Sequence, residues 1–147
     1  MEKLGAILPE GVMSPEFSGA FLEKCEKKKE QKNPPLLYNL AELQNDCSRM
    51  FKISPDETLK IAQELYEKKL TTYPRTDCRY LPEEQFDAAG PILAAIAKIP
   101  GMEHMAGNAD ATLKSGAWNT KKVTAHHAII PTGETPGSLT STERALY

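Results

Sequence analysis

The residues best suited to chemistry lie close together in the segment 73–80, YPRTDCRY. The phenol of Tyr73 could attack a phosphate, and the guanidinium of Arg75 could bind phosphoryl oxygens through two parallel hydrogen bonds. A free tyrosine has a pKa of ~10, so it needs positive charge nearby to act as a nucleophile near neutral pH. The stretch 68–79 supplies this charge, since four bases and one acid give a local charge of 4 − 1 = +3. The four bases are Lys68, Lys69, Arg75 and Arg79.

A second cluster lies downstream, in the segment 121–132, KKVTAHHAIIPT. Adjacent side chains on an extended backbone point to opposite faces, so His126 and His127 cannot easily bind one metal together. One of them could hydrogen-bond a phosphate while the other packs or faces solvent. Taken singly, each cluster also has a structural interpretation. Tyr73 could pack at a helix end beside an Arg75–Asp77 surface ion pair, and the histidines could serve packing alone.

Two well-signalled helices precede the tyrosine segment. Asn39 can cap a helix whose apolar positions recur with a period of 3.6 residues, at Leu40, Leu43, Cys47 and Met50/Phe51. Ser54 begins the capping box SPDE, with proline at the first helical position of a helix that reaches Lys68-Lys69. Because Pro74 disfavours a helical conformation at the residue before it, Tyr73 is expected on an extended segment.

Weaker signals follow the tyrosine segment. Pro82 opens a third predicted helix, which Gly90-Pro91 is expected to break, and 92–99 is a fourth, apolar helix. Residues 100–122 are typical of loop with a short strand near Trp118, and 123–131 of a short strand or turn. Residues 19–26 could form another short strand, and TSTE at 140–143 is a second capping box. The fold predicted is mainly α, compatible with a helix-turn-helix or winged-helix arrangement.

Composition excludes several classes of protein. The 147 residues suffice for one domain, and a net charge of −2 argues against a histone-like protein that coats phosphates. Three cysteines without a C-x-x-C pair fit reduced thiols better than a disulfide framework or a zinc ribbon. No apolar stretch approaches a membrane span, no secretory signal is visible, and no glycine-rich phosphate loop occurs. We therefore expect a cytoplasmic protein, nucleoid-associated if bacterial.

Three motifs in order resemble one family, the type IA DNA topoisomerases in their topoisomerase III form. Residues 70–82, LTTYPRTDCRYLP, resemble the active-site tyrosine segment, and 125–132, AHHAIIPT, resemble the downstream histidine motif. Residues 34–40, PPLLYNL, resemble the segment just upstream. The resemblance covers 33–147 as an active-site tyrosine domain, whereas 1–32 matches poorly and is expected to be a linker or a remnant of the arch of the enzyme.

The resemblance implies a role for each site residue. Tyr73 would form a 5′-phosphotyrosyl link with one DNA strand, and Arg75 would hold the scissile phosphate. Thr76 and Asp77 would orient this arginine. His126, rather than His127, would contact DNA together with Arg79, Lys68 and Lys69. Cys78 departs mildly from the serine that is frequent in the family.

The resemblance also implies what lies outside this sequence. The catalytic glutamate and D-x-D pattern of the family, which bind Mg²⁺, belong to another domain, and no D-x-D occurs here. The chain is therefore expected to be a monomeric fragment without cofactor, inactive alone, that works with single-stranded DNA and the remaining domains. In the family this domain resembles the helical fold of catabolite activator protein. Two alternatives remain, a non-catalytic winged-helix DNA-binding module and a protein-interaction domain that uses Ala94, Ile96 and Ile99.

Overall fold

The computed structural model describes residues 25–147, which belong to two units. The first unit ends at Lys32, and its described residues 25–32 have no regular secondary structure. The strand predicted over 19–26 lies almost wholly outside the described residues. The second unit, Asn33–Tyr147, contains all the elements described below.

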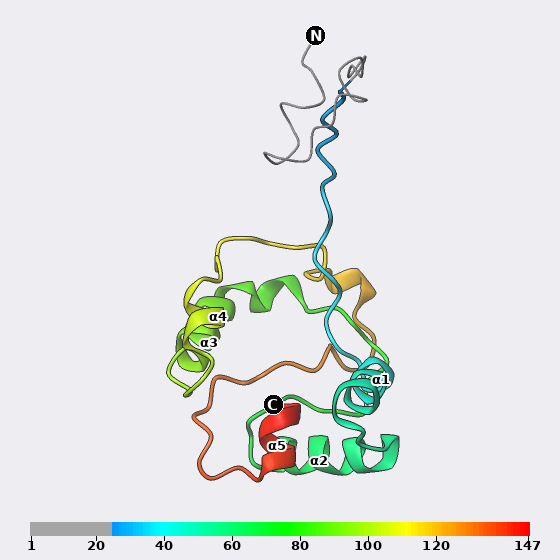
Figure 1. Ribbon diagram of the computed structural model, residues 1–147, viewed down its shortest axis with the longest axis vertical. Helices are drawn as coiled ribbons and strands as arrows, with labels where there is room; N and C mark the ends of the chain where they lie inside the picture. The colour runs from blue at the N-terminus through cyan, green and yellow to red at the C-terminus, as the bar shows by residue number, and fades with distance from the viewer. Residues whose placement is uncertain (1–24) are drawn as a thin grey trace, which may run out of the picture. The chain divides into compact units, whose positions relative to one another are not determined.

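Two capped helices form the first part of this unit (Figure 1). Helix α1 spans Leu40–Phe51, and the Asn39 side chain accepts a hydrogen bond from the Glu42 amide. Helix α2 spans Pro55–Glu67, and the Ser54 hydroxyl accepts one from the Glu57 amide. Both predicted helices are confirmed, with Asn39 and Ser54 as their N-caps, but the Glu57 side chain does not form the reciprocal bond to the Ser54 amide that would complete the predicted capping box.

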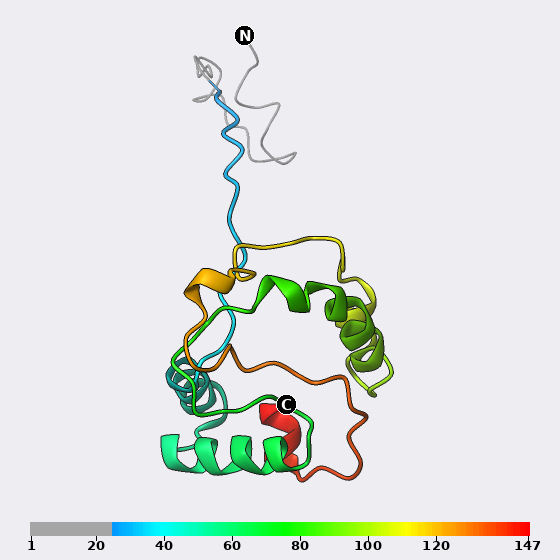
Figure 2. The ribbon, with the colours of Figure 1, turned by 180° about the vertical axis from the view of Figure 1, so that it is seen from behind.

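The core lies between α1, α2 and the C-terminal helix. Helix α5 spans Ser141–Leu146 and begins with the predicted capping box of Thr140 and Glu143. It packs against α2, as Figures 1 and 2 show, although it has only six residues. A helix this short is unstable alone, so packing stabilises it. The buried core side chains are Leu43, Cys47, Ile53, Ile61, Ala62, Leu65 and Leu70.

The helices after the tyrosine segment differ from the prediction. A 3₁₀ helix, η3 (Glu83–Ala88), passes directly into α3 (Ala89–Ile96). The predicted break at Gly90-Pro91 is wrong because both residues lie in the first turn of α3. There an N–H group has no intrahelical partner to lose, so proline is tolerated. Two short helices, α4 (Glu103–Gly107) and η4 (Thr120–Lys122), occupy the region predicted to be loop.

The β structure of the described residues is confined to isolated bridges. Tyr38 pairs with Ile129 and Thr71 with Pro131, both antiparallel, and Leu81 pairs with Trp118 in parallel. The short strands predicted near Trp118 and over 123–131 are therefore single bridges. Residues 25–147 are mainly helical, as predicted, and none of their helices is long and apolar enough to cross a membrane.

Candidate functional site

The segment that carries Tyr73 begins where α2 ends. The Leu70 amide donates to the Leu65 carbonyl, and the Lys69 amide donates to the Tyr66 carbonyl. Lys69 has a φ of 61°, so its backbone is left-handed and closes a Schellman motif. The side chain of Leu70 is buried in the core directly afterwards. This motif reverses the chain direction and leads the chain into the tyrosine segment.

Thr72 ties the tyrosine segment to the histidine segment. Its amide donates to the Ile130 carbonyl (2.9 Å), and its hydroxyl donates to the Ala128 carbonyl (3.1 Å). The same hydroxyl accepts from the Ile130 amide at 2.9 Å. One side chain therefore satisfies two backbone groups of the other segment, next to the residue predicted to be the nucleophile.

Tyr73 contacts two other rings. Its ring centroid lies 4.5 Å from that of His126, with the planes tilted by 39°. Tyr66 of α2 meets Tyr73 edge-on at 5.5 Å and 78°. Tyr73 is half-buried and His126 is exposed, whereas the His127 ring is half-buried and lies against the Ala128 carbonyl, 2.8 Å from Nδ1. The structure thus brings the tyrosine and histidine motifs together, with His126 as the contacting histidine.

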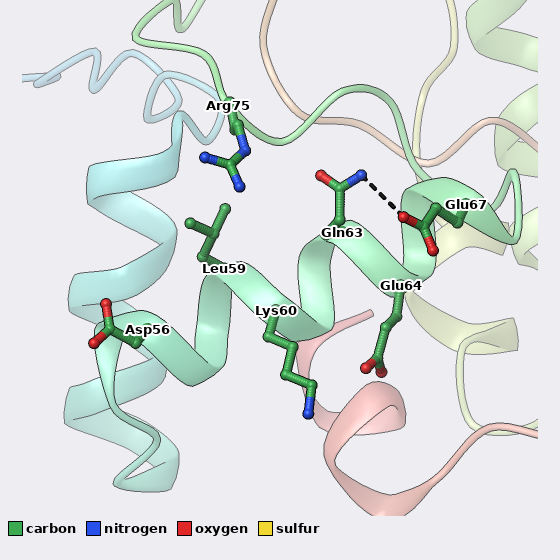
Figure 3. A pocket seen from close by; sticks show the side chains of 7 residues that line it. All are labelled: Asp56, Leu59, Lys60, Gln63, Glu64, Glu67 and Arg75. Carbon is green, nitrogen blue, oxygen red and sulfur yellow. Dashed lines mark hydrogen bonds between the residues drawn. The ribbon is translucent and has the colours of Figure 1, made fainter.

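Arg75 extends over the outer face of α2. Figure 3 shows its guanidinium pointing towards Leu59, at the edge of an open groove of about 480 Å³ that Gln63 also lines. Within residues 25–147 this guanidinium forms no hydrogen bond or ion pair, so the Arg75–Asp77 ion pair considered from the sequence is not formed. The other groove residues are Asp56, Lys60, Glu64 and Glu67.

Thr76 and Asp77 hold the backbone beside Arg75. The buried Thr76 hydroxyl accepts from the Cys78 amide at 3.1 Å and lies 3.5 Å from the His126 carbonyl. A carboxylate oxygen of Asp77 accepts from the Thr124 hydroxyl at 3.2 Å. Both residues fix the chain around the arginine and form no hydrogen bond with its guanidinium.

Three bases predicted to bind DNA have different environments. Lys68 forms an ion pair with Glu143 of α5, 2.5 Å between Nζ and Oε1. The guanidinium of Arg79 donates to the carbonyls of Leu37 (2.8 Å) and Leu36 (3.2 Å). Lys69 has an exposed side chain, and its carbonyl accepts from the Thr132 hydroxyl. Lys68 and Arg79 therefore have structural partners that lie far away in sequence.

The Lys68–Glu143 pair changes the acidity of the buried carboxyl. The hydrogen bond from Lys68 and a second one from the Thr140 amide hold the pKa of Glu143 below its ordinary value. The ionised carboxylate thus fastens α5 to the C-terminal end of α2, just before the tyrosine segment.

Cys78 is buried and participates in hydrogen bonds. Its Sγ lies 3.5 Å from the Lys122 carbonyl and 3.6 Å from the Tyr80 carbonyl, and it accepts from the Tyr80 amide at 3.4 Å. A serine hydroxyl has the same capacity to donate and accept. A serine at this position could therefore form the same kinds of hydrogen bond.

Sequence reasoning assigned no role to Lys122 and Tyr80, which the structure brings together. The Lys122 Nζ lies 4.9 Å from the centroid of the Tyr80 ring and 3.5 Å from its hydroxyl. Lys121-Lys122 belongs to the histidine cluster, but nothing in the sequence links that dipeptide to Tyr80.

The described residues do not fit a site for Mg²⁺. Residues 25–147 contain no group of three histidine, cysteine, aspartate or glutamate side chains placed to hold a metal ion. No step through Mg²⁺ can be derived from these side chains.

Comparison with known proteins gives one consistent result. Residues 14–147 match the family model described as DNA topoisomerase. The chain is 45% identical over 115 residues to DNA topoisomerase 3 of Vibrio cholerae, covering 77% of this chain and 18% of that protein. It is 43% identical over 123 residues to DNA topoisomerase 3 of Pasteurella multocida (82% and 19%) and 38% identical over 133 residues to that of Bacillus subtilis (87% and 18%). The chain thus spans about a fifth of the length of these relatives.

Proposed function

Since the chain belongs to the type IA DNA topoisomerases and is topoisomerase III-like, we propose that it supplies their strand-cleaving tyrosine, Tyr73. The enzyme would break one DNA strand transiently, allow another strand to pass and rejoin the first, without ATP. Because the chain spans about a fifth of its relatives, the remaining domains would be its partners. The DNA substrate would place the enzyme in the cytoplasm, associated with the nucleoid if it is bacterial.

One observation carries the proposal: the Tyr73 and His126 rings are in contact, 4.5 Å between centroids. The tyrosine and histidine motifs are far apart in sequence, and each alone has an ordinary structural interpretation. Their ring contact, two positions along the chain from an arginine without an ion pair among the described residues, supports a site for binding and attack of a phosphodiester.

The proposed reaction exchanges one phosphoester bond for another. The Tyr73 hydroxyl oxygen attacks the phosphorus, and the bond from phosphorus to the 3′ oxygen breaks. The hydroxyl proton leaves Tyr73 as the new bond forms, and the 3′ oxygen takes up a proton as it departs. The upstream piece of the strand then ends in a 3′ hydroxyl. The 5′ end of the downstream piece is joined to Tyr73 through its phosphate. Attack by that 3′ hydroxyl reverses every step, so rejoining needs no ATP.

Arg75 would stabilise the charge that builds on the phosphoryl oxygens. Its guanidinium is exposed and has no partner within residues 25–147, so no ion pair has to break before it binds phosphate. Because the adjoining groove contains three carboxylates, Asp56, Glu64 and Glu67, and one lysine, Lys60, a phosphate bound by Arg75 would lie outside this groove. Thr76 and Asp77 would assist by fixing the backbone on which Arg75 stands.

The remaining predicted contacts divide into two groups. His126 and Lys69 are exposed, and we propose that they contact single-stranded DNA near the break. Lys68 and Arg79 would act mainly by positioning the segment, since Lys68 is paired with Glu143 and the Arg79 guanidinium is held by two backbone carbonyls. The packing of α2 against both α1 and α5 would form the unit that resembles catabolite activator protein.

The polarity of the covalent link tests this proposal. A full-length topoisomerase that carries this segment is incubated with single-stranded DNA labelled at one end, and the products are separated on a denaturing gel. A 3′ label should move with the protein, and a 5′ label should appear on a shorter free strand. A 5′ label that moves with the protein would refute the proposed chemistry.

Arg75→Lys tests the phosphate contact in the same assay. Lysine keeps the charge but loses the planar fork that binds two oxygens. Loss of one charge-assisted hydrogen bond, ~1.5–3 kcal/mol, corresponds to adduct formation slower by about 10- to 150-fold. Arg144→Lys, on the exposed surface of α5, is the matched control and should leave the rate unchanged.

A further inference from the structure

Three side-chain contacts form a row between the tyrosine and histidine segments. Along the histidine segment, the contacting positions are 122, 124 and 126. Lys122 meets Tyr80, Thr124 meets Asp77, and His126 meets Tyr73. Since all three alternate positions are exposed, the row is accessible from solvent. Tyr73 lies at one end of the row and Lys122 at the other.

The lysine end of this row has positive charge that no described acid neutralises. Within residues 25–147, Lys121 and Lys122 form no ion pair, and both are exposed. The nearby acids have other partners: Glu83 pairs with Lys114 at 3.2 Å, and Glu84 accepts from the Thr120 hydroxyl at 3.3 Å. The Lys122 ammonium is therefore held by an aromatic ring and a hydroxyl, neither of which cancels its charge.

We propose that Lys122, positioned by Tyr80, is a second phosphate-binding site for the single strand that Tyr73 cleaves. This inference rests on the proposed function, because it states where the flanking part of the same strand is held. The ligand is single-stranded DNA, with one backbone phosphate at Lys122 and the scissile phosphate at Tyr73 and Arg75. Asp77 lies between the two ends, and its negative charge favours a base over a phosphate there.

The backbone places this second site close to the first. The Ala128 amide donates to the Tyr80 carbonyl at 3.0 Å, and Ala128 follows His126 by only two positions. Two residues of extended chain span at most ~7 Å, so the backbone of Tyr80 lies near the histidine that contacts Tyr73. A strand that reaches Tyr73 therefore has its flanking phosphates within reach of a flexible lysine side chain.

Binding of a fluorescein-labelled single-stranded oligonucleotide to the 147-residue chain tests the proposal, with anisotropy measured over a range of salt concentrations. The wild-type chain should bind weakly, and a few phosphate contacts should give a shallow salt dependence. Lys122→Ala should weaken binding several-fold and reduce the slope of log K against log salt by about 0.7, the value for one phosphate of a single strand. Lys122→Arg should retain binding, and Tyr80→Leu should weaken it because the lysine loses its support.

Lys98→Ala is the matched control, since it removes one exposed positive charge that lies outside the row. It should have little effect on affinity or slope. The proposal is overturned if Lys122→Ala behaves like Lys98→Ala, or if the wild-type chain shows no salt-dependent binding. Because the assay has no cleavage step, it separates this inference from the proposed function. Failure of Tyr73 as the nucleophile would show only in the adduct assay.

Discussion

The ring of Tyr73 contacts two other aromatic rings, which come from different parts of the chain. His126 contacts it with 4.5 Å between ring centroids, and Tyr66 contacts it edge-on at 5.5 Å. Tyr66 belongs to α2, and His126 belongs to a segment without regular secondary structure. The position of the proposed nucleophile therefore depends on how firmly the histidine segment is held to the tyrosine segment.

Thr72→Val tests how the two segments are held together. The substitution keeps the β-branched shape but leaves the Ile130 amide and the Ala128 carbonyl without their hydroxyl partner. We expect a loss of ~1–3 kcal/mol in the free energy of unfolding, the cost of unsatisfied buried groups, measured by urea denaturation. Adduct formation in the full-length enzyme should also slow.

The neighbouring residue provides the control for Thr72. The Thr71 hydroxyl is buried and has no hydrogen-bond partner in the described structure, so Thr71→Val removes an unsatisfied group. Its free energy of unfolding should stay the same or rise slightly. Equal losses for the two valine variants would contradict the role given to Thr72.

The Lys68–Glu143 pair predicts a pH dependence of stability. Because the pKa of Glu143 is lowered in the folded chain, its stabilising effect is complete above the ordinary glutamate pKa of ~4.3. It is lost as the pH falls through the lower folded-state pKa. Thermal unfolding should therefore show a constant gap between wild type and Glu143→Gln from neutral pH to about pH 5, and a shrinking gap below that. A gap that widens on acidification would refute this assignment.

Cys78→Ser should be nearly silent. Serine can donate to the same carbonyls and accept from the Tyr80 amide, so the free energy of unfolding should change by no more than about 1 kcal/mol. Cys78→Ala cannot form these hydrogen bonds, so it should lower the free energy of unfolding by more than Cys78→Ser does. Adduct formation by the full-length serine variant should match wild type, and its loss would mean that the thiol takes part in the chemistry.

The sequence predicted the features that depend on neighbours in the chain. Asn39, Ser54 and Thr140 cap helices because a cap needs only the next three residues. Periodicity likewise identified Leu43 and Cys47 as core positions. Gly90-Pro91 was misinterpreted because a proline looks the same in sequence whether it breaks a helix or lies in its first turn.

The hydrogen-bond and ion-pair partners of the site residues could not be predicted from neighbouring positions in the sequence. Nothing near Lys68 or Arg79 in sequence indicates Glu143 or the carbonyls of Leu36 and Leu37. The missed pair of Lys122 and Tyr80 has the same explanation. The motif resemblance implied only that His126 contacts DNA near the break; its ring contact with Tyr73 is a finding of the structure.

The 147-residue chain alone should not relax supercoiled DNA. Strand passage requires a break to be opened and closed around a second strand, and this chain spans about a fifth of its relatives. The measurement is an agarose-gel relaxation assay with Mg²⁺ and the purified chain. Relaxation that requires both Mg²⁺ and the purified chain would overturn the proposal that the remaining domains are needed.

Tyr73→Phe in a full-length topoisomerase that carries this segment tests the central claim most directly. Phenylalanine keeps the ring that packs against His126 and Tyr66 and removes only the oxygen that must attack phosphorus. Covalent DNA adducts on a denaturing gel should disappear, while single-stranded DNA binding and thermal unfolding stay close to wild type. Tyr66→Phe, which removes the hydroxyl of the neighbouring ring, should form adducts normally. Adducts that persist in Tyr73→Phe would show that another residue is the nucleophile and would contradict the account.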